Sequence, residues 1–216
     1  INCIFTSNYA SDGGGAMDIE EVKFIFLLKS KIVKNKASAR GGGLQIDAAV
    51  TVFFKMLGIE RNWATEGGGG LRCSDLKLCV IFMCIFWANA VDNLGGAMLI
   101  VIPMANNFSI ILSRFQDNSA HHQIGRGGAI YLDYHKYEII SKCTLSLNIF
   151  KKNNAKEIGS VINIEKVNTF HLCNSKVLKI NFVSHALNFD ARNLKIHHVA
   201  IKYVIINTIL INILTT

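Results

Sequence analysis

The chain has 216 residues, of which half are hydrophobic and 18% are charged, with one proline and a net charge of +8 at pH 7. This length can bury a sizeable core, and the composition excludes a disordered charged tail and a proline-rich linker. The positive charge would suit a nucleic acid or an anionic membrane. However, the lysines are scattered among isoleucine and asparagine, and no nucleic-acid-binding motif accompanies them. We therefore expect a basic solvated surface and no nucleic-acid partner.

The start of the chain and its two most apolar runs bear on where the protein resides. The first residue is Ile1, and residues 1–4 read like the end of a repeat, so we expect a fragment of a longer protein. The run 79–91 is shorter than the roughly 20 residues that span a bilayer. The run 199–214 contains Lys202 and Asn207, which favours a buried strand. We expect no membrane span.

A repeated pattern occupies residues 5–196. Its first copy, residues 5–19, contains a large apolar residue, an asparagine three positions later, an alanine, a glycine pair, a small residue and two apolar residues one apart. The small residue recurs at intervals of 27, 27, 27, 32, 32 and 32 residues, in Ala16, Gly43, Gly70, Ala97, Ala129, Val161 and Asn193. Regular self-similarity of this kind indicates a stack of equivalent structural units.

The asparagine of the pattern forms the clearest column. Its members are Asn8, Asn35, Asn62, Asn89, Asn118 and Asn153. Stacked asparagines can donate and accept amide hydrogen bonds along a ladder, as they do in cross-β structures. We therefore predict a structural asparagine ladder. A set of glycan acceptors is the weaker alternative, because only Asn107-Phe108-Ser109 forms an acceptor sequon.

The glycine pairs form a second column, and we predict that they turn the chain. The pairs are Gly14-Gly15, Gly41-Gly42, Gly68-Gly69, Gly95-Gly96 and Gly127-Gly128, which decay to Gly159-Ser160 and Ala191-Arg192. Glycine permits positive φ and a close approach of neighbouring backbones. A phosphate-binding loop is a poor alternative, because no Lys-Ser/Thr follows the glycines and no helix is expected there.

Strand patterns fill the rest of each repeat. After the glycines the sequence alternates between apolar and polar residues, as in Met17-Asp18-Ile19, which is typical of a half-buried strand. Further apolar segments lie at 23–28, 50–54, 76–86, 108–112 and 139–147. In the seventh copy the aligned residues are Phe182, His185, Leu187, Ala191-Arg192 and Leu194-Lys195-Ile196.

These features predict an all-β fold, a right-handed parallel β-helix of about seven coils with 27 to 32 residues per coil. The right hand is inferred from the general rule for crossovers between parallel strands. We expect one β-helix region over residues 1–216, with a degenerate final coil or cap at 197–216.

The repeat resembles that of the chlamydial polymorphic outer-membrane proteins. The best copy pairs Phe115-Gln-Asp-Asn118-Ser-Ala120 with Gly127-Gly128-Ala129-Ile130-Tyr131, and the likeness covers about residues 5–196. The resemblance implies a pectin-lyase-like β-helix in a secreted or cell-surface region that is often adhesive. Its partners would be cell-surface glycans or proteins and other parts of the parent chain. Copies six and seven depart from the pattern, because they lack the glycine pair.

A polysaccharide lyase or glycoside hydrolase on the same scaffold is the alternative. The outward column after the glycines holds Asp18, Gln45, Arg72, Leu99 and Tyr131, which contains no carboxylate cluster. Asp12 and Glu66 lie two coils apart in the preceding turn, at roughly 10 Å, a marginal match to the spacing of paired catalytic carboxylates. We therefore expect no catalytic and no cofactor-binding residues.

The cysteines and histidines are candidates for disulfides or a metal. The six cysteines form no C-x-x-C motif, and Cys3 and Cys84 share a column but lie three coils apart, at about 14 Å, beyond the reach of a disulfide. We expect free thiols, with Cys73 buried as a small apolar residue. His121-His122 and His197-His198 have no partner at ligand spacing, so we expect exposed turn residues and no metal site.

Two outer features remain open. Tyr9 and Trp63 follow the column asparagine and would stack on sugars if exposed or pack into the turn if not. The residues added after Ala97, three of them between Ala120 and Gly127, must bulge from the rod, so specific recognition is expected in the later coils.

Overall fold

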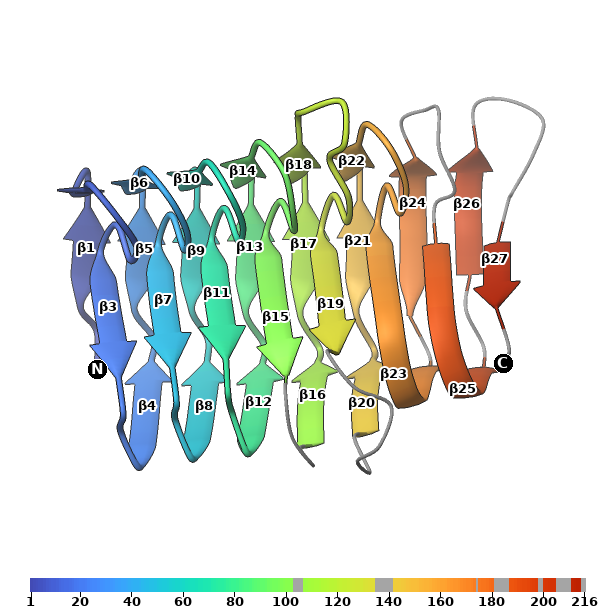
Figure 1. The fold of residues 1–216 in the computed structure, drawn as a ribbon, viewed down its shortest axis with the longest axis horizontal. Helices are drawn as coiled ribbons and strands as arrows, with labels where there is room; N and C mark the ends of the chain where they lie inside the picture. The colour runs from blue at the N-terminus through green and yellow to red at the C-terminus, as the bar shows by residue number, and fades with distance from the viewer. Residues whose placement is uncertain are drawn as a thin grey trace.

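The computed structural model describes residues 1–102, 107–134, 142–173, 175–180, 187–197, 200–204 and 211–214. Over these ranges every element is a β-strand, and no helix is present that is long and apolar enough to cross a bilayer. The strands form three parallel sheets that run along a rod (Figure 1). The predicted parallel β-helix is therefore confirmed. Strand pairing does not depend on the hand of the helix, so the right hand stays a prediction.

Sheet A has eight strands in the order of the coils. They are β1 (Ile4–Thr6), β5 (Lys31–Val33), β9 (Gly58–Glu60), β13 (Ile85–Trp87), β17 (Arg114–Gln116), β21 (Ile149–Lys151), β24 (Lys176–Ile180) and β26 (Ala200–Val204). Sheet B has six very short strands, β2 (Tyr9–Ala10), β6 (Lys36–Ala37), β10 (Trp63–Ala64), β14 (Ala90–Val91), β18 (Ser119–Ala120) and β22 (Asn154–Ala155). The six strands of sheet B therefore define six complete coils.

Sheet C has two arms. Arm C1 follows the glycine turns and contains β3 (Met17–Glu20), β7 (Leu44–Asp47), β11 (Leu71–Ser74), β15 (Met98–Ile102) and β19 (Ile130–Tyr134). Arm C2 contains β4 (Phe24–Leu28), β8 (Thr51–Lys55), β12 (Leu78–Phe82), β16 (Asn107–Ile111) and β20 (Lys142–Ser146). The long strand β23 (Ile162–Cys173) pairs with both arms, and β25 (Leu187–His197) and β27 (Ile211–Leu214) continue the sheet.

The core consists of inward columns in which like residues stack from coil to coil. Phe86, Phe115 and Phe150 are fully buried, with ring centroids 4.8 and 5.1 Å apart and nearly parallel planes. Small residues fill the narrower space beside sheet B, where Ala64, Val91, Ala120 and Ala155 form a separate buried cluster. Stacked apolar columns remove their surface from water over the whole rod, which is the main force that stabilises such a fold.

The predicted asparagine ladder is present from Asn8 to Asn153. The Oδ1 atom of each member after Asn8 accepts from the backbone N–H and the Nδ2 group of the asparagine one coil earlier, for example at 3.1 and 3.0 Å between Asn62 and Asn89. The Nδ2 group of Asn89 also donates to the Ile59 carbonyl at 2.8 Å. The members from Asn35 to Asn153 are buried, whereas Asn8 is exposed at the end of the ladder.

The two glycines of a pair have different roles. In each of the first six coils the first glycine has positive φ, as at Gly68 with φ of 66°. At the second glycine a Cβ atom would collide with the next coil, since at Gly69 it would lie 2.3 Å from the Gly96 carbonyl oxygen. The prediction that these glycines turn the chain is therefore confirmed, and the second one permits the close stacking of coils.

Three further corners also use left-handed backbone, but without glycine. Their residues have φ between 50° and 58° and include Lys29, Met56, Met83, Leu112 and Leu147 at the corner before sheet A. Non-glycine residues in this region are uncommon, because the Cβ atom crowds the backbone. The glycine pairs therefore marked one corner of each coil and the asparagine column a second, and the sequence pattern left the other two unmarked.

A second ladder lies at the corner before sheet A. Its column, which we call the mixed ladder, contains Cys3, Ser30, Leu57, Cys84, Ser113, Asn148 and Ser175. Side chains in it accept from the backbone N–H one coil earlier, as Ser113 Oγ does from Cys84 at 3.1 Å and Asn148 Oδ1 does from Ser113 at 2.9 Å. Cys84 and Ser113 also donate to carbonyls in their own coil, those of Phe82 and Ile111.

The register predicted for the seventh copy is wrong. Leu187, not Leu194, pairs with Ile162, and Leu194 pairs with Phe170. Ala191 and Arg192 lie inside β25, so they do not form a turn. Without a glycine pair nothing in the sequence fixes the corner, and a period-two pattern fits registers that differ by a shift along the strand. Phe182 and His185 lie outside the described residues.

Candidate binding groove

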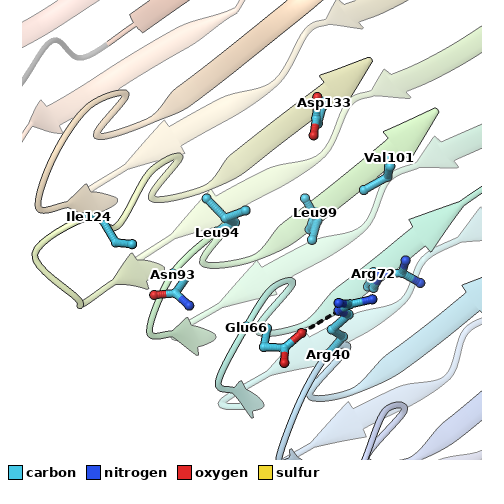
Figure 2. Close-up of a pocket in the computed structure, with 9 residues that line it drawn as sticks. All are labelled: Arg40, Glu66, Arg72, Asn93, Leu94, Leu99, Val101, Ile124 and Asp133. Carbon is cyan, nitrogen blue, oxygen red and sulfur yellow. Dashed lines mark hydrogen bonds and ion pairs between the residues drawn. The ribbon is translucent and has the colours of Figure 1, made fainter. Parts of the chain in front are cut away.

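A groove of about 560 Å³ lies on the outer face of arm C1, where β11, β15 and β19 meet the turns that precede them (Figure 2). Its position follows from the coil, because the turns before the glycines stand beside the strands after them. The residues that line it are Arg40, Glu66, Arg72, Asn93, Leu94, Leu99, Val101, Ile124 and Asp133. The groove therefore combines charged groups with an aliphatic wall.

An ion pair between adjacent coils forms one side of the groove. Arg40 Nε donates to Glu66 Oε2 at 2.7 Å, and both side chains are about half exposed. The same arrangement recurs farther along the rod, where Arg126 donates to Glu157 from Nε at 2.6 Å and from Nη2 at 3.1 Å. An exposed pair of this kind contributes about 0.5 kcal/mol to stability, so its main effect is to orient the two side chains.

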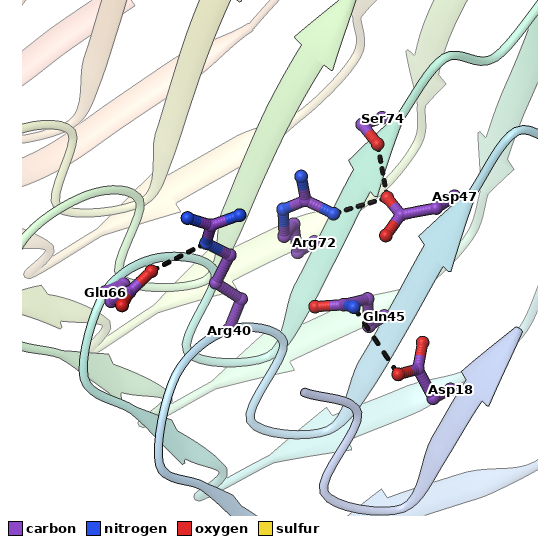
Figure 3. Close-up of polar contacts among 7 residues, drawn as sticks. All are labelled: Asp18, Arg40, Gln45, Asp47, Glu66, Arg72 and Ser74. Atoms are coloured by element: carbon purple, nitrogen blue, oxygen red, sulfur yellow. Dashed lines mark hydrogen bonds and ion pairs between the residues drawn. The ribbon is translucent and has the colours of Figure 1, made fainter. Parts of the chain in front are cut away.

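Arg72 lies deeper, on β11. Its Nη1 group donates to Asp47 Oδ1 in the preceding coil, and Ser74 Oγ donates to the same carboxylate oxygen (Figure 3). The Arg72 residue is only 9% exposed, and its Nε atom is buried without a hydrogen-bond partner. A buried donor without a partner lowers the stability of the fold. Arg72 Nε is therefore a hydrogen-bond donor that no described side chain uses.

Gln45 and Asp18 continue the same outward column toward the N-terminus. Gln45 Nε2 donates to Asp18 Oδ2 at 3.4 Å (Figure 3). The pKa of the Asp18 carboxyl is raised, mainly by partial burial and also by the nearby Asp47 carboxylate, while the Gln45 hydrogen bond opposes the shift. A raised pKa means that ionisation of Asp18 destabilises the fold as the pH rises through the ordinary range for aspartate.

The aliphatic wall comes from the later coils. Leu94, Leu99 and Val101 lie on or before β15, and Ile124 extends from the enlarged turn with 56% of its surface exposed. Leu99 is buried, as is Tyr131 in the same column. The outward column was expected to be mostly polar and half-buried, but its residues are buried from Arg72 onward. The enlarged turn itself is confirmed, since the segment between β18 and β19 extends beyond the turns between β14 and β15 and between β22 and β23 (Figure 1).

The carboxylates singled out in the sequence lie two coils apart, as predicted. Asp12 and Glu66 lie in the same turn column with Ala39 between them, since the Ala39 N–H donates to the Asp12 carbonyl and the Glu66 N–H donates to that of Ala39. Glu66 is held by Arg40. The groove carboxylates are therefore Glu66 and Asp133. The sequence pattern did not indicate Asp133 or the contact between Arg72 and Asp47, because both depend on the register of separate coils.

The histidines of the enlarged turn are exposed, as predicted. A ring nitrogen of His121 lies 2.9 Å from Ser119 Oγ, and the Gly125 N–H donates to the His122 carbonyl at 2.7 Å. Within the described ranges no group of three or more histidine, cysteine or acidic side chains could hold a metal ion. His197 ends β25, and His198 lies outside the described residues.

All six cysteines are free thiols, as predicted. Cys73, Cys79, Cys84 and Cys143 are buried, and burial raises the pKa of each thiol, for Cys84 to about 11. A thiol with a raised pKa is a poor nucleophile at neutral pH. These four cysteines therefore act as small apolar residues.

The two aromatic residues of sheet B differ in their exposure. Tyr9 is 65% exposed, and its hydroxyl group lies 2.8 Å from Ser38 Oγ. Trp63 is half-buried, and Lys36 Nζ lies 4.5 Å from the centre of its ring. Tyr9 is thus the more available of the two for contact with a ligand.

Comparison with known proteins identifies no relative: no protein-family model, curated protein or solved structure matches the chain. The functional assignment consequently depends on the residues and their geometry.

Proposed function

We propose that this chain is a non-enzymatic repeat region of a secreted or cell-surface protein, in which the β-solenoid is a rigid scaffold and the outward positions make adhesive contacts. The observation that carries the proposal is the contrast between columns. The asparagine ladder keeps one residue type over six coils, whereas the outward column of arm C1 changes in every coil. A constant interior with a variable exterior is typical of repeat proteins that present binding surfaces.

The groove supports binding more than turnover. Its arginines are each held by a carboxylate, Arg40 by Glu66 and Arg72 by Asp47. Paired charges beside Leu94 and Leu99 offer hydrogen bonds and apolar contact.

The repeat resemblance supports the same reading. A parallel β-helix is the fold that a polymorphic outer-membrane protein repeat of the pectin-lyase-like kind would adopt, and such regions are extracellular or on the cell surface. The partners we propose are cell-surface glycans or proteins, together with other parts of the parent chain.

A binding assay with a parallel turnover assay tests the proposal. The labelled chain is applied to a panel of cells and immobilised glycans, and we expect saturable binding that unlabelled chain displaces, without change to the bound glycan. Absence of saturable binding on every surface would contradict the adhesive role.

A polysaccharide lyase or hydrolase is the second candidate, because Glu66 and Asp133 both line the groove. This function predicts release of reducing or unsaturated ends from a polysaccharide panel, with loss of that release in both Glu66→Gln and Asp133→Asn. Product release that survives both substitutions would exclude the groove as its source.

A further inference from the structure

Basic side chains gather on one side of the rod, at the outward positions of sheets A and B and in the corners that flank sheet B. We call this surface the basic face. Its members are Lys31, Lys34, Lys36, Arg61, Arg114, Lys151, Lys152 and Lys156. All are exposed except Lys151, which is half-buried. Separated by up to 125 residues in the sequence, they are brought together by the register of coils two to six.

Acidic residues are fewer on the same surface. Among the described residues they are Glu60, Asp92 and Asp117, and the corner between sheet B and arm C1 adds Asp12, Glu66 and Glu157, the last two paired with Arg40 and Arg126. With these corner residues included, ten bases less six acids leave +4 of the net +8 of the chain on this side. The opposite balance holds on arm C1 and the corner that follows it, where Asp18, Glu20, Glu21, Asp47 and Asp75 lie. Charge is therefore sorted around the rod, which the scattered lysines of the sequence did not indicate.

Two tryptophan rings make cation–π contacts with basic side chains of this face. Lys36 Nζ and the Arg61 guanidinium group each lie 4.5 Å from a ring centre, those of Trp63 and Trp87 respectively. Trp87 Nε1 donates in turn to Asp117 Oδ2 at 3.3 Å. Cation–π contacts of this kind hold long side chains in place at the surface. The basic face is thus partly ordered before any ligand arrives.

We propose that the basic face binds a linear acidic polysaccharide, carrying sulfate or carboxylate groups, that lies along the axis of the rod. Four coil steps separate β5 from β21, so at about 4.8 Å per step the lysine clusters of coils two and six lie roughly 19 Å apart, with Arg61 and Arg114 between them. Flexible lysine side chains act as point charges and suit anionic groups distributed along a chain. The inference deepens the adhesive role proposed above and depends on it.

The composition of the face favours a polysaccharide over a nucleic acid. Single-stranded nucleic acids are bound by aromatic rings on which bases stack, together with basic grooves. Here a cation covers each tryptophan ring, and six of the eight basic residues are lysines rather than the arginines that pair bidentately with phosphate. A nucleic acid and an anionic membrane are therefore competing outcomes of the test.

The test compares two triple variants of the full chain that lose the same net charge. Lys34→Gln/Lys152→Gln/Lys156→Gln removes exposed charges of the basic face, and Lys23→Gln/Lys77→Gln/Lys195→Gln removes exposed charges from sheet C and its corner. Binding is measured to immobilised heparin, alginate, neutral dextran, single-stranded DNA and vesicles that contain an anionic lipid. Circular dichroism and thermal melting verify that both variants remain folded.

We expect the wild type to bind heparin or alginate but not dextran, with affinity that falls as salt is added. The basic-face variant should lose about tenfold in affinity, since three exposed ion contacts are removed, and the control variant should lose less than threefold. Equal losses in both variants, or tighter binding to DNA or to vesicles than to either polysaccharide, would overturn the proposal. If the basic-face variant still adheres to cells like the wild type, the adhesive role stands and the basic face is not its site.

Discussion

The two ladders perform the same task with different residues. In the asparagine ladder the members between the two ends are amides that bridge to the coils on both sides, as Asn89 does to Asn62 and Asn118. In the mixed ladder Ser113 accepts from the neighbouring coil but donates within its own coil, to the Ile111 carbonyl. Asn148, in the same column, reaches the Ile110 carbonyl of the preceding coil instead. The mixed corner therefore tolerates side chains of different kinds, including Leu57, which has no acceptor, whereas the asparagine corner uses a side chain that bridges coils in both directions.

Both ladders depend on the spacing of the coils, so the largest effect is expected from Gly69→Ala. The new Cβ atom would lie 2.3 Å from the Gly96 carbonyl oxygen and 2.4 Å from that of Ala90, and neither backbone can move without separating coils. We expect a loss of about 4 kcal/mol in the free energy of unfolding, measured by denaturant titration. Gly67→Ala is the matched control, because its Cβ would meet the end of the flexible Leu99 side chain, and equal losses in the two variants would contradict this account.

Asn89→Ala tests the asparagine ladder. It removes the acceptor of the Asn62 N–H and Nδ2 groups and the donor to the Ile59 carbonyl, all of them buried. Because buried groups are left unpaired, the free energy of unfolding should fall by about 3 kcal/mol. Asn8→Ala, at the exposed end of the same ladder, should cost less than about 1 kcal/mol. A loss at Asn89 no larger than that at Asn8 would show that the ladder contributes little to stability.

Only the mixed ladder contains an ionisable group, so alkaline pH should weaken the mixed ladder and leave the asparagine ladder unchanged. The pKa of the Cys84 thiol is about 11 in the folded chain, against 9.0 as its ordinary value. The thiol therefore favours the folded state below pH 9.0, and that contribution is lost as the pH rises through 11. Between these two pH values the free energy of unfolding of the wild type should fall by about 2 kcal/mol more than that of Cys84→Ser. Parallel pH profiles of the two proteins would contradict the burial of this thiol.

The smallest effect is expected from substitutions within the mixed ladder. Ser113→Ala removes the acceptor of the Cys84 N–H and should cost about 1 kcal/mol. Ser113→Asn keeps an acceptor, as Asn148 does one coil later, and should cost less than the alanine variant. If alanine is the better tolerated of the two, the Cys84 N–H does not need this partner.

The difference between the ladders also explains what the sequence could predict. A column of identical residues is visible in one sequence, so the asparagine ladder, the glycine turns and the strands after them were predicted correctly through the sixth coil. The mixed ladder was missed because Cys3, Ser30, Leu57 and Asn148 share a position but not a residue type. The corners at residues such as Met83 and Leu112 were missed for a related reason, since their left-handed backbone carries no glycine.

The groove and the basic face depend on register more than on composition. Arg72 contacts Asp47, 25 residues earlier, and Arg40 contacts Glu66, 26 residues later, so neither contact is a local pattern. The register of the last coil failed because β25 passes through the corner without a glycine and an alternating pattern permits more than one alignment. Sequence periodicity therefore identifies the interior of the rod better than its surface.

Amide hydrogen exchange of the ladder asparagines is the most direct test of the stacking on which the account depends. The backbone N–H groups of Asn35, Asn62 and Asn89 each donate to an asparagine side chain of the next coil. Residue-resolved exchange measured by NMR should therefore show these amides protected to the same degree as the strands of arm C1. Exchange as fast as that of the exposed turn at His121 and His122 would contradict the ladder and the coil register built on it.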